Sequence, residues 1–130
     1  MADRNRTALV AGAIRFTSGV SFLVSPAMAN QLWGGERDET PTAQLLLRSM
    51  GYRDALIGGM LLRSGWRNDP SSAGWLLASA GADAADLLGG LANHDRMGAK
   101  QKVIGLGGAV VGIAVGVYGA WRTRRSFSRQ

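Results

Sequence analysis

The sequence predicts an all-α integral membrane protein, a four-helix bundle with up-down-up-down topology, for three reasons. A chain of 130 residues is long enough for a single domain, residues 1–130. Four apolar segments, each close to the length that spans a bilayer, alternate with loops that carry charges and helix breakers. The tryptophans fall at or near the segment ends, as in an interfacial aromatic belt: Trp33, Trp66, Trp75 and Trp121. The mean hydropathy of +0.01 conceals this pattern because charged and apolar residues are separated along the chain.

The first three predicted spans, residues 7–25, 41–62 and 71–93, each contain charged residues. A secretory signal peptide is the competing interpretation of the first span. Arg15, in the middle of its apolar region, argues against a signal peptide and favours a retained helix.

Residues 103–121 form the clearest span, because none of these 19 residues is charged. At 1.5 Å per residue they reach about 28 Å, close to the thickness of the bilayer core. Glycines recur on one face of this span, where another helix of the chain or a second copy can approach closely. Packing within the chain is the favoured interpretation of these glycines, and the alternative is a homo-oligomer that assembles through Gly105, Gly108, Gly112 and Gly116.

A soluble four-helix protein is the architectural alternative. The glycine-rich fourth span disfavours it, because each glycine in a soluble helix costs about 1 kcal/mol relative to alanine.

The loop charges predict how the protein is oriented in the inner (plasma) membrane. Four spans place both termini on one side together with the loop between the second and third spans. That side carries more basic residues than the other, so the positive-inside rule predicts cytoplasmic termini. The basic tail, residues 122–130, is expected to contact membrane lipid and not nucleic acid.

The composition excludes several kinds of site. With no cysteine, the chain cannot form a disulfide scaffold, a thiolate zinc site or an iron–sulfur cluster. The single histidine, His94, lies in a loop, which makes a hydrolase triad a poor interpretation of the serines. We therefore expect no metal and no cofactor.

Six ionisable residues lie inside the predicted spans, and their formal charges sum to zero. A lone charge at the bilayer centre costs about 2.5 to 3.5 kcal/mol, so such residues face the bundle interior and pair with one another. The six residues are Arg15, Arg48, Arg53, Asp54, Asp83 and Asp86.

The second and third spans form an antiparallel hairpin, in which residues equidistant from the turn lie at equal depth. This places Arg48 level with Asp86, and Tyr52 level with Asp83. The same reasoning places Arg15 at this depth, within reach of Asp83 or of the tyrosine hydroxyl. Arg53 is expected to point away from this face and to have different neighbours from Asp54.

The runs RSMGYRDALIG at residues 48–58 and DAADLL at residues 83–88 resemble small four-helix bacterial membrane proteins of the DoxX-like kind. These include uncharacterised-domain families with an arginine-glycine-arginine-acid motif in helix two and an aspartate motif in helix three. The resemblance covers most of the chain. It implies that the six charged residues form the polar centre, and it leaves the ligand open.

Two functions fit this polar centre, and the sequence leaves open whether the protein is an enzyme. In the first, an intramembrane pocket binds a lipophilic small molecule or acts on it by acid–base chemistry, as an isomerase, hydratase or cyclase. Catalytic roles then fall to Asp83, Asp86 and Asp54, and ligand-binding roles to Arg15, Arg48, Tyr52 and Arg53. In the second, the protein is a non-enzymatic membrane subunit or oligomer whose buried ion pairs are structural. Ion or proton transport along the polar face of the third span is a further possibility that would require oligomerisation.

Overall fold

The computed structural model describes residues 4–32, 39–92, 95, 98–99 and 102–129. The regular structure of these residues is helical, which confirms the all-α prediction for them. The elements are α1 (Arg6–Val24), α2 (Pro26–Leu32), α3 (Pro41–Trp66), α4 (Ser72–Ala92), the π-helical turn η2 (Lys102–Leu106) and α6 (Gly107–Ser128).

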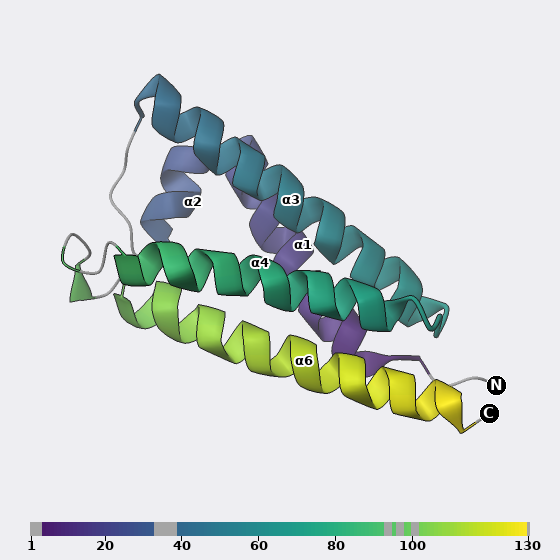
Figure 1. The fold of residues 1–130 in the computed structure, drawn as a ribbon. Helices are drawn as coiled ribbons and strands as arrows, with labels where there is room; N and C mark the ends of the chain where they lie inside the picture. The colour runs from purple at the N-terminus through teal and green to yellow at the C-terminus, as the bar shows by residue number, and fades with distance from the viewer. Residues whose placement is uncertain (1–3, 33–38, 93–94, 96–97, 100–101, 130) are drawn as a thin grey trace.

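The long helices α1, α3, α4 and α6 cover the four predicted spans and alternate in direction (Figure 1). Two features differ from the prediction. The helix α2 was not expected; it begins at Pro26, whose fixed φ suits the first turn of a helix. The segment predicted as a basic tail is helical as far as Ser128, because α6 continues past Trp121 without a helix breaker. Trp33 and His94 lie outside the described residues.

Two helical segments are long and apolar enough to cross a membrane, Arg6–Val24 and Lys102–Ser128. Only 22% of the apolar window of each is buried inside the protein, unlike the core helix of a soluble domain. The charged helices α3 and α4 do not meet this criterion, so their crossing of the membrane stays a prediction.

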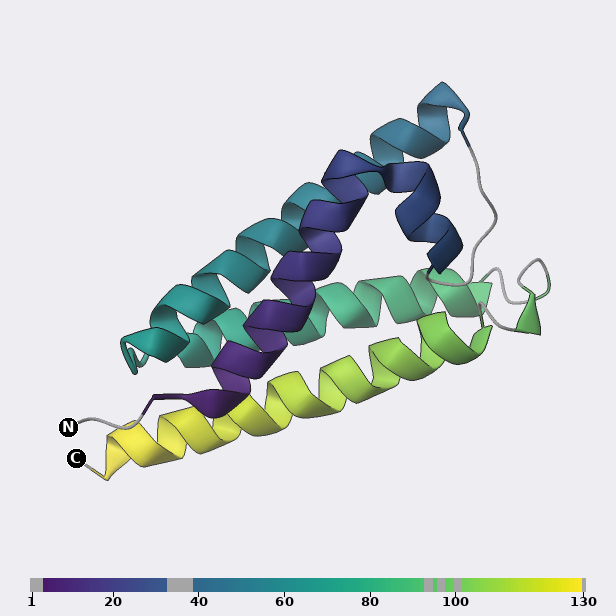
Figure 2. The ribbon, with the colours of Figure 1, turned by 180° about the vertical axis from the view of Figure 1, so that it is seen from behind.

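The four long helices form two pairs, α1 with α3 and α4 with α6. The pairs converge at the end that holds both termini and the turn between α3 and α4, and they diverge toward the end that holds α2 (Figures 1 and 2). This places the termini and the middle turn at one end, as the four-span arrangement predicts.

Glycines bring the backbones of α1 and α3 into direct contact. Gly12 and Gly19 on α1, and Gly51 and Gly58 on α3, are seven residues apart and so share a helix face. A Cβ atom at Gly12 would lie 2.8 Å from the Gly58 carbonyl oxygen, and one at Gly51 would lie 2.8 Å from the Gly19 carbonyl oxygen. Close approach was expected on the fourth span, and it occurs there at Gly112 and Gly116. The most extensive helix contact, however, lies between α1 and α3.

Asn5 joins three helices at the convergent end. Its Oδ1 accepts a hydrogen bond from the Ala8 amide at 3.1 Å and caps α1. Its own amide donates to the Gly65 carbonyl oxygen at the end of α3, at 3.0 Å. Its Nδ2 donates to Thr123 Oγ1 on α6, at 2.8 Å. This end is therefore held together by hydrogen bonds that do not depend on the charges deeper in the bundle.

The solvent-accessible surface, 8139 Å², exceeds the roughly 6,600 Å² expected for a compact soluble monomer of this mass. Much of the excess is apolar. Large exposed apolar side chains occur on every long helix, among them Val10, Ile14 and Val24 on α1, Leu45 and Leu46 on α3, Leu88 and Leu91 on α4, and Val110, Val111 and Val117 on α6. Such a surface disfavours the soluble alternative.

We expect Gly58→Ala to lower the free energy of unfolding by about 1–3 kcal/mol, because the added Cβ would overlap the backbone of Phe16. Thermal unfolding in detergent micelles, followed by circular dichroism, measures the change. Gly81→Ala on α4 is the matched control, since its Cβ would have nothing within 4 Å. Equal midpoints for the two variants would contradict the tight α1–α3 contact.

Candidate functional site

Arg15 connects three helices in the middle of the molecule. Its Nη1 donates to Asp54 Oδ1 on α3 at 2.8 Å, and its Nη2 donates to Asp83 Oδ1 on α4 at 2.5 Å. Nη2 also lies 3.3 Å from the Ser79 carbonyl oxygen. The side chain is 11% exposed, so these contacts replace most of its hydration. The prediction that Arg15 reaches Asp83 is confirmed.

Arg53 extends this network along α3 and across to α4. Its Nε donates to the same oxygen of Asp54 that Arg15 binds, at 3.0 Å. Its Nη1 and Nη2 bind the two oxygens of Asp86 at 3.1 and 3.0 Å, a bidentate pair. We call the five residues the ion-pair cluster, in the order of contact Asp83, Arg15, Asp54, Arg53 and Asp86.

The ion-pair cluster changes from buried to exposed along its length. The side chains of Arg15, Asp54 and Asp83 are 11 to 15% exposed, whereas that of Asp86 is 43% exposed. The inner pairs therefore lie in a poorly hydrated environment, and the outer pair is open to the surroundings.

Two predicted site residues lie outside the cluster. Arg48 is exposed and makes no ion pair with any described residue. Arg53 binds Asp86 in the position that was expected for Arg48. Tyr52 is 62% exposed, and Asp83 binds Arg15 instead of the tyrosine. Equal depth along the hairpin was not enough to identify the partners, because it does not specify how each helix is rotated about its axis. The buried face of α3 is centred on Asp54, Gly58 and Leu61, which leaves Arg48 and Tyr52 exposed.

Arg53 and Asp54 bind different neighbouring helices, as expected, since Asp54 binds Arg15 on α1 and Arg53 binds Asp86 on α4. A direct contact between the two residues was not expected. Adjacent helical residues diverge by about 100°, but the long Arg53 side chain folds back so that its Nε reaches Asp54. Its terminal nitrogens still bind Asp86. Arg53 thus binds two carboxylates, those of Asp54 and Asp86.

Glycines of α6 make room for α4. A Cβ at Gly112 would overlap Asp83 Oδ2, and one at Gly116 would lie 2.7 Å from the Leu76 carbonyl oxygen. Two of the four glycines expected in an oligomer interface are therefore packed inside the chain. Gly105 and Gly108 are exposed.

The ion-pair cluster has a formal charge of −1, from three carboxylates and two guanidinium groups. Carboxylates already hold both guanidinium groups. By contrast, the Oδ2 atoms of Asp54 and Asp83 accept no hydrogen bond from the described residues. The atoms that the cluster leaves unpaired among the described residues are therefore acceptor oxygens, whereas Arg15 and Arg48 were expected to stabilise an anion.

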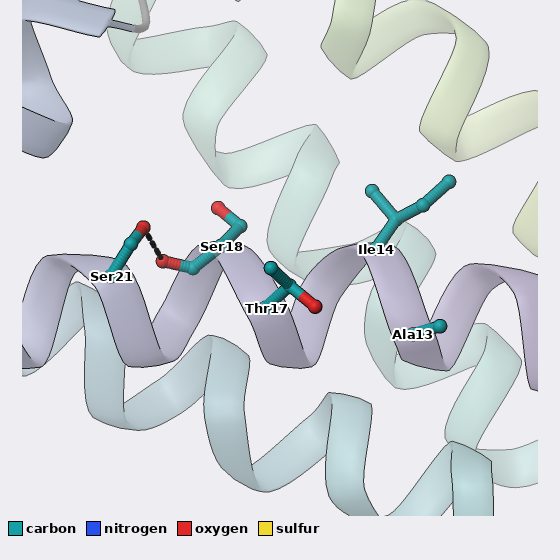
Figure 3. Close-up of a pocket in the computed structure, with 5 residues that line it drawn as sticks. All are labelled: Ala13, Ile14, Thr17, Ser18 and Ser21. Carbon is teal, nitrogen blue, oxygen red and sulfur yellow. Dashed lines mark hydrogen bonds between the residues drawn. The ribbon is translucent and has the colours of Figure 1, made fainter.

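A hollow of about 480 Å³ lies along α1 (Figure 3). It is open to the surroundings and is lined by Ala13, Ile14, Thr17, Ser18 and Ser21. Within it, Ser21 Oγ donates to the Ser18 carbonyl oxygen at 2.6 Å, which satisfies the hydroxyl group locally. This surface was not predicted from the sequence, although three hydroxyl residues, Thr17, Ser18 and Ser21, lie within five positions of an apolar span.

Residues 12–120 match the family described as Domain of unknown function (DUF4267). The chain belongs to the DUF4267 family. The match confirms the expectation of an uncharacterised-domain family, and it includes all five residues of the ion-pair cluster. The resemblance to DoxX-like proteins stays a prediction. No curated protein and no solved structure matches this DUF4267 chain.

We expect Arg15→Gln to destabilise the protein by about 3–5 kcal/mol, because it leaves the poorly hydrated Asp83 carboxylate without a cation and Asp54 with Arg53 alone. Arg48→Gln is the matched control, and its effect should stay within about 0.5 kcal/mol because the side chain is exposed and unpaired in the described structure. Thermal unfolding in detergent micelles measures both. A smaller effect at Arg15 than at Arg48 would contradict the assignment of Arg15 to the centre of the network.

Proposed function

We propose that this DUF4267 protein spans the inner (plasma) membrane with α1, α3, α4 and α6, and that both termini are cytoplasmic. The apolar surface on all four long helices supports this, as do the two helical segments of membrane-spanning length. The positions of the basic residues support the orientation, since eight arginines lie at the end that holds the termini.

Membrane insertion predicts that the protein stays in the pellet when membranes are washed with alkaline carbonate and high salt, and is released only by detergent. Immunoblotting of the fractions measures this. Recovery in the soluble fraction without detergent would overturn the membrane assignment and restore the soluble four-helix alternative.

We further propose that the ion-pair cluster binds the polar group of a lipophilic small molecule and exchanges a proton with it. The observation that supports this is the surplus carboxylate charge beside two acceptor oxygens that the described residues leave free. One proton on any of the three carboxylates would make the cluster neutral. A neutral cluster is favoured in lipid, so the cluster is suited to taking up or giving up a single proton.

In this mechanism Asp83 is the residue that exchanges the proton, because Arg15 binds its Oδ1, while its Oδ2, which lies against Gly112 on α6, accepts no hydrogen bond from the described residues. Asp54, bound through Oδ1 by both arginines, presents the second available oxygen. Arg15 and Arg53 are positioning residues that hold the carboxylates, since their guanidinium groups are already engaged. Chemistry of this kind fits an isomerase, hydratase or cyclase acting on an apolar substrate.

The alternative, a non-enzymatic subunit whose ion pairs are structural, is supported by the same network, because it joins α1, α3 and α4. The two proposals differ in their dependence on the proton. A structural network tolerates a neutral isostere that keeps the hydrogen bond, whereas proton exchange does not.

Asp83→Asn is therefore the decisive variant, because its amide oxygen can still accept from Arg15. We expect the purified variant to fold but to lose at least about tenfold in affinity, or all turnover, for a ligand of the parent protein. The probes are an isoprenoid alcohol, an isoprenoid quinone and a polycyclic phenol, measured by thermal stabilisation and by product analysis.

Arg48→Gln should match the parent protein with every probe, because Arg48 lies outside the cluster. If Asp83→Asn and Asp86→Asn fold normally and bind or convert the probes as well as the parent, the acid–base role is wrong. A loss of stability alone, with ligand binding intact, would favour the structural alternative.

A further inference from the structure

Eight exposed arginines from three separate parts of the chain gather at the convergent end of the bundle. Two precede or begin α1, two lie at the end of α3, and four lie in the last turns of α6. We call them the arginine collar: Arg4, Arg6, Arg63, Arg67, Arg122, Arg124, Arg125 and Arg129. The hydrogen bonds of Asn5 to Gly65 and Thr123 hold the three parts together. Both chain ends lie at this end of the molecule (Figures 1 and 2).

Little negative charge opposes the arginine collar. Within residues 4–10, 60–75 and 118–129, the acidic residue is Asp69. Its Oδ1 accepts a hydrogen bond from the Ser71 amide at 2.8 Å, and this bond holds the pKa of Asp69 below its usual value. Nearby Arg67 and Arg63 lower the pKa further. With eight cations against one anion, the described residues of this surface have a formal charge of +7.

Exposed aromatic rings lie among these arginines. The Arg4 guanidinium stacks 3.3 Å from the centroid of Trp66, and that of Arg125 lies 5.1 Å from the centroid of Trp121. The two tryptophans are 59% and 53% exposed, and the Tyr118 ring lies 6.2 Å from that of Trp121. Tryptophan and tyrosine favour the headgroup depth of a bilayer. The rings therefore place the guanidinium groups at the level of lipid phosphates.

We propose that the arginine collar binds the phosphate headgroups of anionic phospholipids in the cytoplasmic leaflet. Guanidinium groups form paired hydrogen bonds with phosphate oxygens, which a lysine ammonium cannot do, and no lysine occurs in the three described stretches that make up this surface. This interaction anchors the protein at a defined depth. It rests on the proposed membrane insertion and is independent of the chemistry at the ion-pair cluster.

The experiment measures retention of phosphatidylglycerol and of phosphatidylcholine with identical acyl chains on the purified protein in non-ionic detergent, by native mass spectrometry. We expect the parent protein to prefer phosphatidylglycerol by at least about tenfold. Replacing Arg4, Arg63 and Arg67 together by glutamine should weaken phosphatidylglycerol binding by up to roughly a hundredfold at low salt, since each arginine contributes about fivefold. The preference should also fall as salt is raised.

A second variant replaces Arg122, Arg124, Arg125 and Arg129, at the exposed end of α6, by glutamine. It keeps the test valid if the first variant does not fold. Arg48→Gln, which removes an exposed arginine at the opposite end of α3, is the matched control and should bind lipid as the parent does. Equal retention of the two lipids, or an equal loss in the Arg48 variant, would overturn the proposal. So would tighter binding of a short RNA duplex that displaces the lipid. Failure of the carbonate test would instead remove the membrane assignment itself.

Discussion

The pairing of Arg15 with Asp54 and Asp83 is the interaction on which the arrangement of the helices depends, because it joins the α1–α3 pair to the α4–α6 pair. The Arg15 guanidinium group is only 11% exposed, so removing its carboxylate partners would strongly destabilise the protein. The glycines let the helices come close enough for these ion pairs to form. Gly12, Gly19, Gly51 and Gly58 bring α1 close enough to α3 for Arg15 to reach Asp54, and Gly112 leaves space on α6 for the Asp83 carboxylate. The small residues and the charges therefore act as one system.

The ion-pair cluster contains more acid than structural pairing requires. Two arginines and two aspartates would join the same helices without a net charge, yet a third carboxylate, Asp86, extends the cluster to a position that is 43% exposed. Removing charges from water is expensive, and buried pairs add little net stability. The surplus carboxylate, and the oxygens of Asp54 and Asp83 that accept no hydrogen bond from the described residues, are the features on which the proposed proton exchange rests. At the convergent end the charge balance is opposite, and a strongly basic surface faces the expected headgroup region.

Sequence patterns identified most of the elements and part of the site. Charges inside apolar segments singled out Arg15, Asp54, Asp83 and Asp86, since lipid makes isolated charges costly. Counting from the turn correctly put Arg15 at the depth of Asp83. The prediction then failed at Arg48, because depth along a hairpin does not define the rotation of a helix about its axis. The seven-residue spacing of glycines on α1 and α3 carried that information. The Ser25-Pro26 break, for its part, marked the start of α2.

The sequence by itself determined the all-helical class, the positions of the long helices and the set of charged residues that must find partners. These properties depend on composition and spacing along one chain, where the cost of an apolar surface in water, or of a charge in lipid, applies to each segment separately. Only the tertiary structure decided which arginine binds which aspartate, which glycines contact another backbone, and that the basic residues of three segments meet around Asn5. Those outcomes depend on how the helices are rotated and how they cross. Contacts between side chains from distant parts of the chain determine both.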